Sequence, residues 1–176
     1  MGEASYQNIQ LLIDEGLATL TLDRPNRLNS FNAKMHWEVK EAFEQIKIDN
    51  SVRCLLITGS GKGFCAGQDL SARPLDTSAE MPDLAKSIEK NWNPLVRNIT
   101  KLEMPVLCAV NGVAAGAGAN IALACDIVIA ARSASFIQAF NKLGLVPDCG
   151  GTWNLPRLVG QSRALSLCLL GEKITA

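Results

Sequence analysis

Two glycine-rich stretches decide how this chain folds: Gly63-Phe64-Cys65-Ala66-Gly67-Gln68-Asp69 and Asn111-Gly112-Val113-Ala114-Ala115-Gly116-Ala117-Gly118. Each directly follows an apolar run typical of a buried strand, residues 52–58 for the first and 106–110 for the second. Glycine and alanine leave the backbone accessible, so each stretch can present one free N–H group. Two such donors, brought together, would stabilise the oxygen of a thioester as it becomes an enolate. Taken singly, either stretch is equally consistent with a tight turn.

The composition is that of one globular domain. The chain has 176 residues, of which 48% are hydrophobic and 19% are charged, so it is long enough to bury a substantial core. Seventeen basic residues balance seventeen acidic ones and are scattered along the sequence, and we therefore expect a small-molecule ligand rather than nucleic acid or a membrane surface. No apolar run approaches a membrane span, and the first residues lack a signal-peptide profile. We expect a single domain over residues 1–176, located in the cytoplasm.

The cysteines predict neither disulfides nor a metal site. They include no Cys-x-x-Cys pair, and most lie within apolar runs, where a free cysteine behaves as a small buried hydrophobic residue. The six are Cys54, Cys65, Cys108, Cys125, Cys149 and Cys168.

Hydrophobic periodicity predicts an alternation of strands and helices. Residues 9–13 and 17–22 alternate as the two strands of a hairpin, and residues 23–31 form a connecting loop. After Asn32, a good helix N-cap, apolar side chains recur at helical spacing. These side chains are Met35, Val39, Phe43 and Ile46. Residues 119–124 suit a closely packed helix and residues 126–131 a further buried strand, so a strand–strand–helix repeat emerges.

Two further segments carry expectations about the site and the end of the chain. Residues 70–102 are polar and contain prolines, with a helical centre at residues 85–99, and are expected to form a mobile flap beside the substrate. Residues 162–170 predict a helix closed by Gly171, and Ile174-Thr175-Ala176 reads as the start of a new helix cap.

Several short motifs together resemble the crotonase, or enoyl-CoA hydratase/isomerase, superfamily. They are Arg24-Pro25, Leu28-Asn29, Phe64-Cys65-Ala66-Gly67-x-Asp69, Pro105 followed by Asn111-Gly112, and Gly144-Leu145-x-Pro147-x-x-Gly150-Gly151-Thr152. Within the superfamily, residues 63–70, 111–118 and 142–153 are most similar to the isomerases of phenylacetate degradation, which act on the ring-1,2-epoxide of phenylacetyl-CoA.

The resemblance implies an α/β fold, a ClpP-like spiral of ββα repeats. Members of the superfamily normally continue into helices that complete the acyl pocket and the trimer interface, so the resemblance implies that this chain lacks the C-terminal helical part. Trimers or dimers of trimers are usual for full-length relatives, and we expect a homo-oligomer. Apolar faces in residues 165–170 and 121–131 are expected to be left open to water.

The resemblance also assigns the oxyanion hole and the substrate contacts. The two donors are the backbone N–H groups of Gln68 and Ala117, and Ala117 also opens a helix, whose dipole adds positive potential. The residues implied to contact the substrate or its CoA are Arg27, Leu28, Ala66, Asp69, Leu70, Gly116 and Phe140.

The catalytic side chain implied by the resemblance is Asp148. Hydratases of the superfamily place two glutamates over the site, but the matching residues here are Asn120 and Phe140, and neither can act as a general base. Asp148 matches the aspartate that some isomerases use. The alternative for Asp148 is an ordinary helix N-cap. A following helix would lower its pKa, whereas the apolar side chains of Phe140, Trp92 and Leu145 would raise it.

Three functions remain open at this stage. The first is a CoA-thioester isomerase, which acts on the phenylacetyl-CoA epoxide or moves a β,γ double bond to the α,β position. The second is another reaction of the superfamily, such as hydration, hydrolysis or dehalogenation, although dehalogenases of similar sequence have His and Trp where this chain has Asn93 and Phe140. The third is a truncated acyl-CoA-binding module without activity. A proton shift needs neither a metal nor a redox cofactor, and His36, the single histidine, is expected to be structural or solvated.

Overall fold

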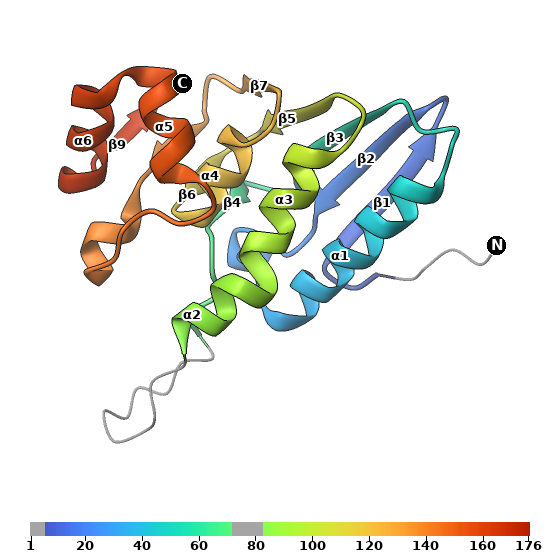
Figure 1. Cartoon of the computed structure of the whole chain (residues 1–176), viewed down its shortest axis with the longest axis horizontal. Coiled ribbons are helices and arrows are strands. Elements are labelled where there is room, and N and C mark those ends of the chain that lie inside the picture. The colour runs from blue at the N-terminus through green and yellow to red at the C-terminus, as the bar shows by residue number, and fades with distance from the viewer. Residues whose placement is uncertain (1–5, 72–82) are drawn as a thin grey trace.

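A strand–strand–helix unit recurs along the chain. The computed structural model describes residues 6–71 and 83–176, and Figure 1 shows the successive units side by side. The elements are, in order, β1 (Ile9–Asp14), β2 (Leu17–Leu22), η1 (Pro25–Arg27), α1 (Ala33–Ile48), β3 (Cys54–Gly59), β4 (Gly63–Cys65), α2 (Leu84–Ser87), η2 (Ile88–Trp92), α3 (Asn93–Lys101), β5 (Val106–Val110), β6 (Val113–Ala115), α4 (Ala117–Leu123), β7 (Ile127–Ala130), β8 (Ser135–Ile137), η3 (Ala139–Leu143), α5 (Gly151–Val159), α6 (Gln161–Leu170) and β9 (Lys173–Thr175).

The strands form two sheets, and each later repeat adds one strand to each sheet. The first sheet has the order β1-β2-β3-β5-β7 and the second the order β4-β6-β8-β9. β1 and β2 form the expected antiparallel hairpin, whereas β2, β3, β5 and β7 run parallel. The short strands β4, β6 and β8 are also parallel to one another. This topology carries the ends of β4 and β6 to neighbouring positions.

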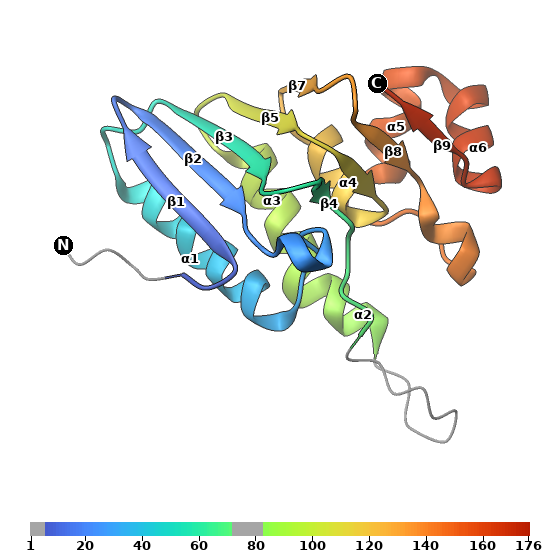
Figure 2. The same ribbon diagram turned by 180° about the vertical axis from the view of Figure 1, so that it is seen from behind.

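Helices α1 and α3 cover one face of the larger sheet, as the two opposite views show (Figures 1 and 2). The predicted cap of α1 is present, because Asn32 Oδ1 accepts a hydrogen bond from the Met35 N–H at 2.8 Å. The apolar stripe of this helix, including Phe43 and Ile46, is fully buried with Leu20 and Leu55 from the sheet. Burial of this stripe against the strands supplies the driving force that holds the helix in place.

The structure corrects two expectations near the end of the chain. Ile174-Thr175-Ala176 does not begin a helix, because β9 pairs with β8 in an antiparallel arrangement that places Ile174 opposite Phe136. The expected open apolar face at residues 121–131 is only partly present, since Ile121 and Ala122 of α4 are buried and the exposed residues lie in β7. The expected exposure on α6 is observed, with Leu169 70% exposed.

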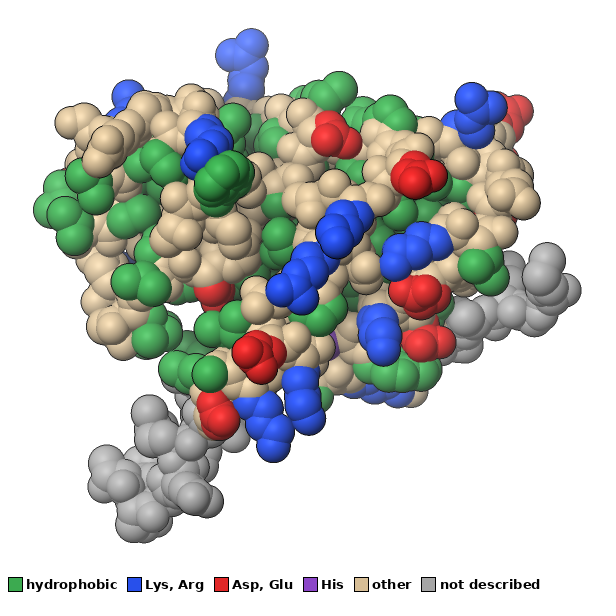
Figure 3. All heavy atoms as spheres, viewed as in Figure 1, with side chains coloured by type: hydrophobic (Ala, Val, Ile, Leu, Met, Phe, Trp, Pro, Cys, Tyr) green, Lys and Arg blue, Asp and Glu red, His purple; other side chains and the backbone are tan. Residues whose placement is uncertain are grey.

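Apolar side chains gather on the surface at the end of the molecule formed by α5 and α6 (Figure 3). The exposed large hydrophobic residues of these two helices are Trp153, Leu158, Val159, Leu165, Leu169 and Leu170. Among the helices of the described residues, none combines the length and the apolar character that crossing a membrane requires.

Candidate active site

The two glycine-rich stretches meet where β4 pairs with β6. Cys65 lies opposite Ala114 in this pairing. Gly118 is required for the approach, because a β-carbon at that position would overlap the carbonyl oxygen of Cys65. Gly67 adopts φ +83°, a conformation that other residues rarely adopt, and a β-carbon there would lie 3.4 Å from the backbone nitrogen of Ala117. The spacing of glycines in both stretches thus follows from close contact between them.

Gln68 and Ala117, the two predicted oxyanion-hole residues, both line one cavity. Phe31 holds the first loop from two sides: its N–H donates to the Gly67 carbonyl at 2.8 Å, and its carbonyl accepts from the Asp69 N–H at 2.9 Å. Ala117 is the first residue of α4, where a backbone N–H has no acceptor within the helix. Among the described residues, no hydrogen-bond acceptor is found for the N–H of either Gln68 or Ala117.

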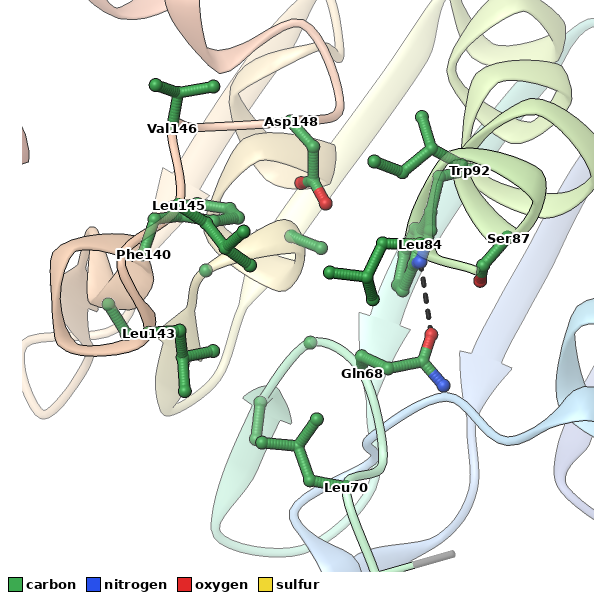
Figure 4. A pocket seen from close by; sticks show the side chains of 16 residues that line it. Gln68, Leu70, Leu84, Ser87, Trp92, Phe140, Leu143, Leu145, Val146 and Asp148 are labelled. Atoms are coloured by element: carbon green, nitrogen blue, oxygen red, sulfur yellow. Dashed lines mark hydrogen bonds between the residues drawn. The ribbon is translucent and has the colours of Figure 1, made fainter. Parts of the chain in front are cut away.

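The cavity has a volume of about 260 Å³ and apolar walls. In Figure 4, Phe140, Leu143 and Leu145 lie on one side, Leu84 and Trp92 on the other, and the Asp148 carboxylate points between them. Among the described lining residues, Asp148 alone carries an ionisable side chain. The described residues that line it are Ala66, Gly67, Gln68, Leu70, Leu84, Ser87, Ile88, Trp92, Gly116, Ala117, Ala139, Phe140, Leu143, Leu145, Val146 and Asp148.

Asp148 projects into this cavity from the loop between η3 and α5. Its Oδ1 atom is buried and has no hydrogen-bond partner among the described residues. Burial raises the pKa of Asp148, and hydrogen bonds from the Cys149 thiol and from the N–H of Asp148 itself offset only part of the effect. The N-cap of α5 is Gly150, so the alternative of Asp148 as an ordinary N-cap is wrong. Burial is therefore the largest of the influences on the pKa of this carboxyl group.

Asn120 and Gln138 support the Asp148 loop from behind. Asn120 Nδ2 donates to the backbone carbonyl of Asp148 at 2.9 Å, and Asn120 Oδ1 accepts from Gln138 Nε2 at 2.8 Å. Both side chains are buried, and a β-carbon at Gly151 would overlap the Asn120 amide. The Asn120 side chain therefore uses both ends of its amide to support the Asp148 loop. The sequence pattern contains no signal for the contribution of Gln138, because the bond joins residues brought together only by the fold.

Three predicted CoA contacts lie outside the lining of the cavity. Arg27 ends η1 and is exposed, and the carbonyl of Leu28 accepts from the Ala66 N–H at 2.9 Å. The Asp69 carboxylate accepts from the Ser71 hydroxyl at 2.6 Å and pairs with Arg24 at 2.9 Å. The hydrogen bonds from Ser71, with the contribution of Arg24, lower the pKa of Asp69 to about 2. The Asp69 carboxylate thus holds the loop, while Ala66, Leu70, Gly116 and Phe140 line the cavity.

The expected flap contributes one wall. Residues 72–82 of that segment lie outside the described residues, whereas Leu84, Ser87, Ile88 and Trp92 line the cavity. Behind this wall His36 is buried, with its ring 4.8 Å from Phe31 and 4.5 Å from Trp92. Burial lowers the pKa of His36 to about 4, so the expected structural role is the one observed. In residues 6–71 and 83–176, no cluster of three or more His, Cys, Asp or Glu side chains is arranged to hold a metal ion.

Comparison with known proteins identifies the family. Residues 13–176 match the family described as enoyl-CoA hydratase/isomerase. The chain belongs to this family. It is 59% identical, over 93% of its length, to the 1,2-epoxyphenylacetyl-CoA isomerase of Escherichia coli strain K12, and it covers 63% of that protein. It is 49% identical, over 98% of its length, to a probable enoyl-CoA hydratase of Rhodobacter capsulatus, of which it covers 65%.

Solved structures of the family share the fold. An enoyl-CoA hydratase from Bacillus anthracis superimposes with a TM-score of 0.88 at 33% identity, over 97% of this chain and 65% of that one. An enoyl-CoA hydratase from Mycobacterium avium subsp. paratuberculosis superimposes with a TM-score of 0.85 at 34% identity, over 98% of this chain and 64% of that one. The crotonase fold expected from the motifs is confirmed. The chain spans slightly less than two thirds of the length of the relatives it matches.

Proposed function

We propose that this chain carries the catalytic site of a CoA-thioester isomerase, which moves a proton through an enolate intermediate. The observation that carries the proposal is the content of one apolar cavity. Among the described residues, its lining includes Gln68 and Ala117, whose backbone N–H groups have no acceptor, and one ionisable side chain, that of Asp148. This set provides one base and one electrostatic site for an oxyanion.

In the proposed mechanism, Asp148 first removes a proton from the substrate and then returns it. The Asp148 carboxylate removes a proton from the α-carbon of a β,γ-unsaturated thioester, and the electron pair moves into the thioester carbonyl. The Gln68 and Ala117 N–H groups stabilise the resulting oxyanion, each by about 3 kcal/mol. The protonated Asp148 then returns the proton at the γ-carbon, and the double bond ends at the α,β position. No atoms are gained or lost, and no electron acceptor is needed.

The raised pKa of Asp148 suits this role. A carboxylate with a raised pKa is a stronger base and accepts a proton from carbon more readily. The apolar walls of the cavity that cause the rise also limit the access of water to the enolate. The same environment would therefore favour proton return over addition of water.

The proposed substrates are aryl or alkenyl thioesters of CoA. The aromatic rings of Phe140 and Trp92 line the cavity, and the Escherichia coli relative is named for an epoxide of phenylacetyl-CoA. We therefore propose that epoxide, or a β,γ-enoyl-CoA, as substrate. Arg27 and Leu28 are proposed to lie toward the CoA end. We also propose that the exposed apolar side chains of α5 and α6 bury against a second copy of the chain, which would make sedimentation depend on concentration.

Hydration is the second candidate, because the Rhodobacter capsulatus relative is a probable enoyl-CoA hydratase. Activation and protonation of water require two groups that exchange protons. Asn120 stands where the second acid would be needed, and both ends of its amide are engaged. This arrangement favours the isomerase.

A direct assay separates these functions. The purified chain is supplied with trans-3-hexenoyl-CoA, and we expect trans-2-hexenoyl-CoA to accumulate, whereas crotonyl-CoA should be hydrated negligibly. Hydration of crotonyl-CoA as fast as isomerisation would contradict the proposal. Saturable binding of both thioesters without conversion of either would favour an acyl-CoA-binding module.

A further inference from the structure

The side chain of Gln68 links the oxyanion loop to the helical wall of the cavity. Its Nε2 donates to the carbonyl of Phe31 at 3.0 Å, and its Oε1 accepts from Nε1 of Trp92 at 3.1 Å. Figure 4 shows the second bond running from Trp92 across to the Gln68 loop. Both ends of the amide are therefore engaged, and the Gln68 side chain is tied to two elements far from it in sequence.

Trp92 is held in a fixed position by its surroundings. It is 2% exposed, and its ring lies 5.1 Å from Phe31 and 4.5 Å, edge-on, from His36. It ends η2, a π-helical turn between α2 and α3, and π-helical turns are frequent at functional sites. A buried indole N–H needs an acceptor, and Gln68 Oε1 is the acceptor found among the described residues.

The Gly67–Gln68 peptide carries the proposed donor, and its orientation must be fixed by neighbouring groups. The Gln68 N–H belongs to the Gly67–Gln68 peptide, and Gly67, with φ +83°, offers little steric resistance to rotation of that peptide. The Phe31 N–H anchors its carbonyl side, at the oxygen of Gly67. The Gln68 side chain anchors its other side. An oxyanion hole is effective only when its donors are oriented before the reaction starts.

We infer that the Gln68–Trp92 hydrogen bond makes both side chains positioning residues, which orient the Gln68 N–H toward the thioester oxygen. This inference rests on the proposed oxyanion hole. The bond joins the helical wall, through Trp92, to the loop that carries the Gln68 N–H. The orientation of this donor therefore depends on the position of the wall. Neither side chain exchanges protons with the substrate.

Trp92→Phe tests the inference, because phenylalanine keeps an aromatic ring in the cluster and removes the N–H donor, and Gln68→Met removes the acceptor without making that ring smaller. Trp37→Phe is the matched control, since Trp37 is 58% exposed on α1 and outside the cavity lining. Cinnamoyl-CoA, which lacks a proton that can be shifted, serves as the probe. Polarisation of its carbonyl by the hole shifts its ultraviolet absorption to longer wavelength on binding.

For Trp92→Phe we expect a smaller absorption shift of bound cinnamoyl-CoA and a kcat for trans-3-hexenoyl-CoA lower by roughly five- to tenfold, with KM nearly unchanged. Trp37→Phe should change neither quantity. Gln68→Met, which keeps the length of the side chain and its backbone N–H, should reproduce the loss. It also provides the test if Trp92→Phe fails to fold by circular dichroism.

The outcomes separate this inference from the proposed function. If the wild-type chain binds cinnamoyl-CoA without an absorption shift, the oxyanion hole is wrong, and the proposed function fails with it. If the wild-type chain shows the shift and isomerises, while Trp92→Phe and Gln68→Met retain both in full, the positioning role is wrong and the proposed function stands.

Discussion

Asn120 Nδ2 donates a hydrogen bond of 2.9 Å to the backbone carbonyl of Asp148, joining α4, whose first residue is Ala117, to the loop that carries the proposed base. One short helix thus carries a proposed oxyanion donor at its start and a support for the base one turn later. Helix α4 thus carries the donor and, through this hydrogen bond, holds the loop of the base, which is how rigid elements position the groups of a site.

Removal of this support is expected to destabilise the chain and to slow catalysis. Asn120→Ala deletes the bond to Asp148 and leaves the Gln138 amide without its acceptor, so the free energy of unfolding should fall by about 1–3 kcal/mol. Urea denaturation measures this change. Asn50→Ala, at an exposed position after α1, should alter stability by less than about 0.5 kcal/mol. Equal free energies of unfolding for the two variants would show that the Asn120 hydrogen bonds do not contribute to stability.

The Asp148 pKa predicts opposite effects on activity and stability. Because burial raises this pKa, the ionised carboxylate destabilises the folded state at neutral pH, and Asp148→Asn should melt at a higher temperature than the wild type while losing isomerase activity. In the wild type, kcat should fall as pH decreases through a pKa above the ordinary 3.8. A variant that melts lower, or an acid limb at or below that ordinary value, would count against a base whose pKa is raised by burial.

The oxyanion donor on α4 can be removed without a large change of helix geometry. Proline is well tolerated at the first position of a helix, so Ala117→Pro should keep α4 while deleting the N–H. We expect kcat to fall by about 10²–10³-fold for Ala117→Pro. Ala117→Ser retains the backbone donor and is the control. Similar kcat values for the two variants, with both folded by circular dichroism, would place this N–H outside the hole.

His36 predicts a loss of stability on mild acidification. Burial lowers its pKa from 6.5 to about 4, so between these pH values the unfolded chain binds a proton that the folded chain does not. The free energy of unfolding should therefore decrease as pH falls from 6.5 to 4, by roughly 3 kcal/mol in total. His36→Gln should lack this component when unfolding is measured across the same pH range. If the free energy of unfolding depended equally on pH in the wild type and in His36→Gln, the lowered pKa of His36 would be contradicted.

The parts of the fold that follow from local periodicity were predictable. Hydrophobic patterns long enough to show a period occur in the β1–β2 hairpin, in α1 with its Asn32 cap, and in the strands before the glycine-rich stretches. The strands β4, β6, β8 and β9 have only three residues each, which is too short for a period. The expectation that a helix begins at Ile174 was wrong because β9 is one of these short strands, and its pairing partner β8 is distant in sequence.

The site divides in the same way. The glycine motifs and the position of Asp148 in the sequence predicted residues that line the cavity, namely Gln68, Ala117 and Asp148 itself. The bonds from Gln138 to Asn120 and from Trp92 to Gln68 join residues 18 and 24 positions apart, and they depend on tertiary packing that no local pattern encodes. The direction of the Asp148 pKa shift also required the structure, because it depends on how deeply the fold buries the carboxyl group.

The most direct test of the proposed base and oxyanion hole is exchange of the α-protons of phenylacetyl-CoA in deuterated water, followed by NMR. This thioester forms the enolate without any rearrangement, so exchange reports proton removal alone. We predict that the wild-type chain catalyses the exchange and that Asp148→Asn, with phenylacetyl-CoA still bound, does not. Exchange at the wild-type rate in Asp148→Asn would contradict the proposal that Asp148 is the base.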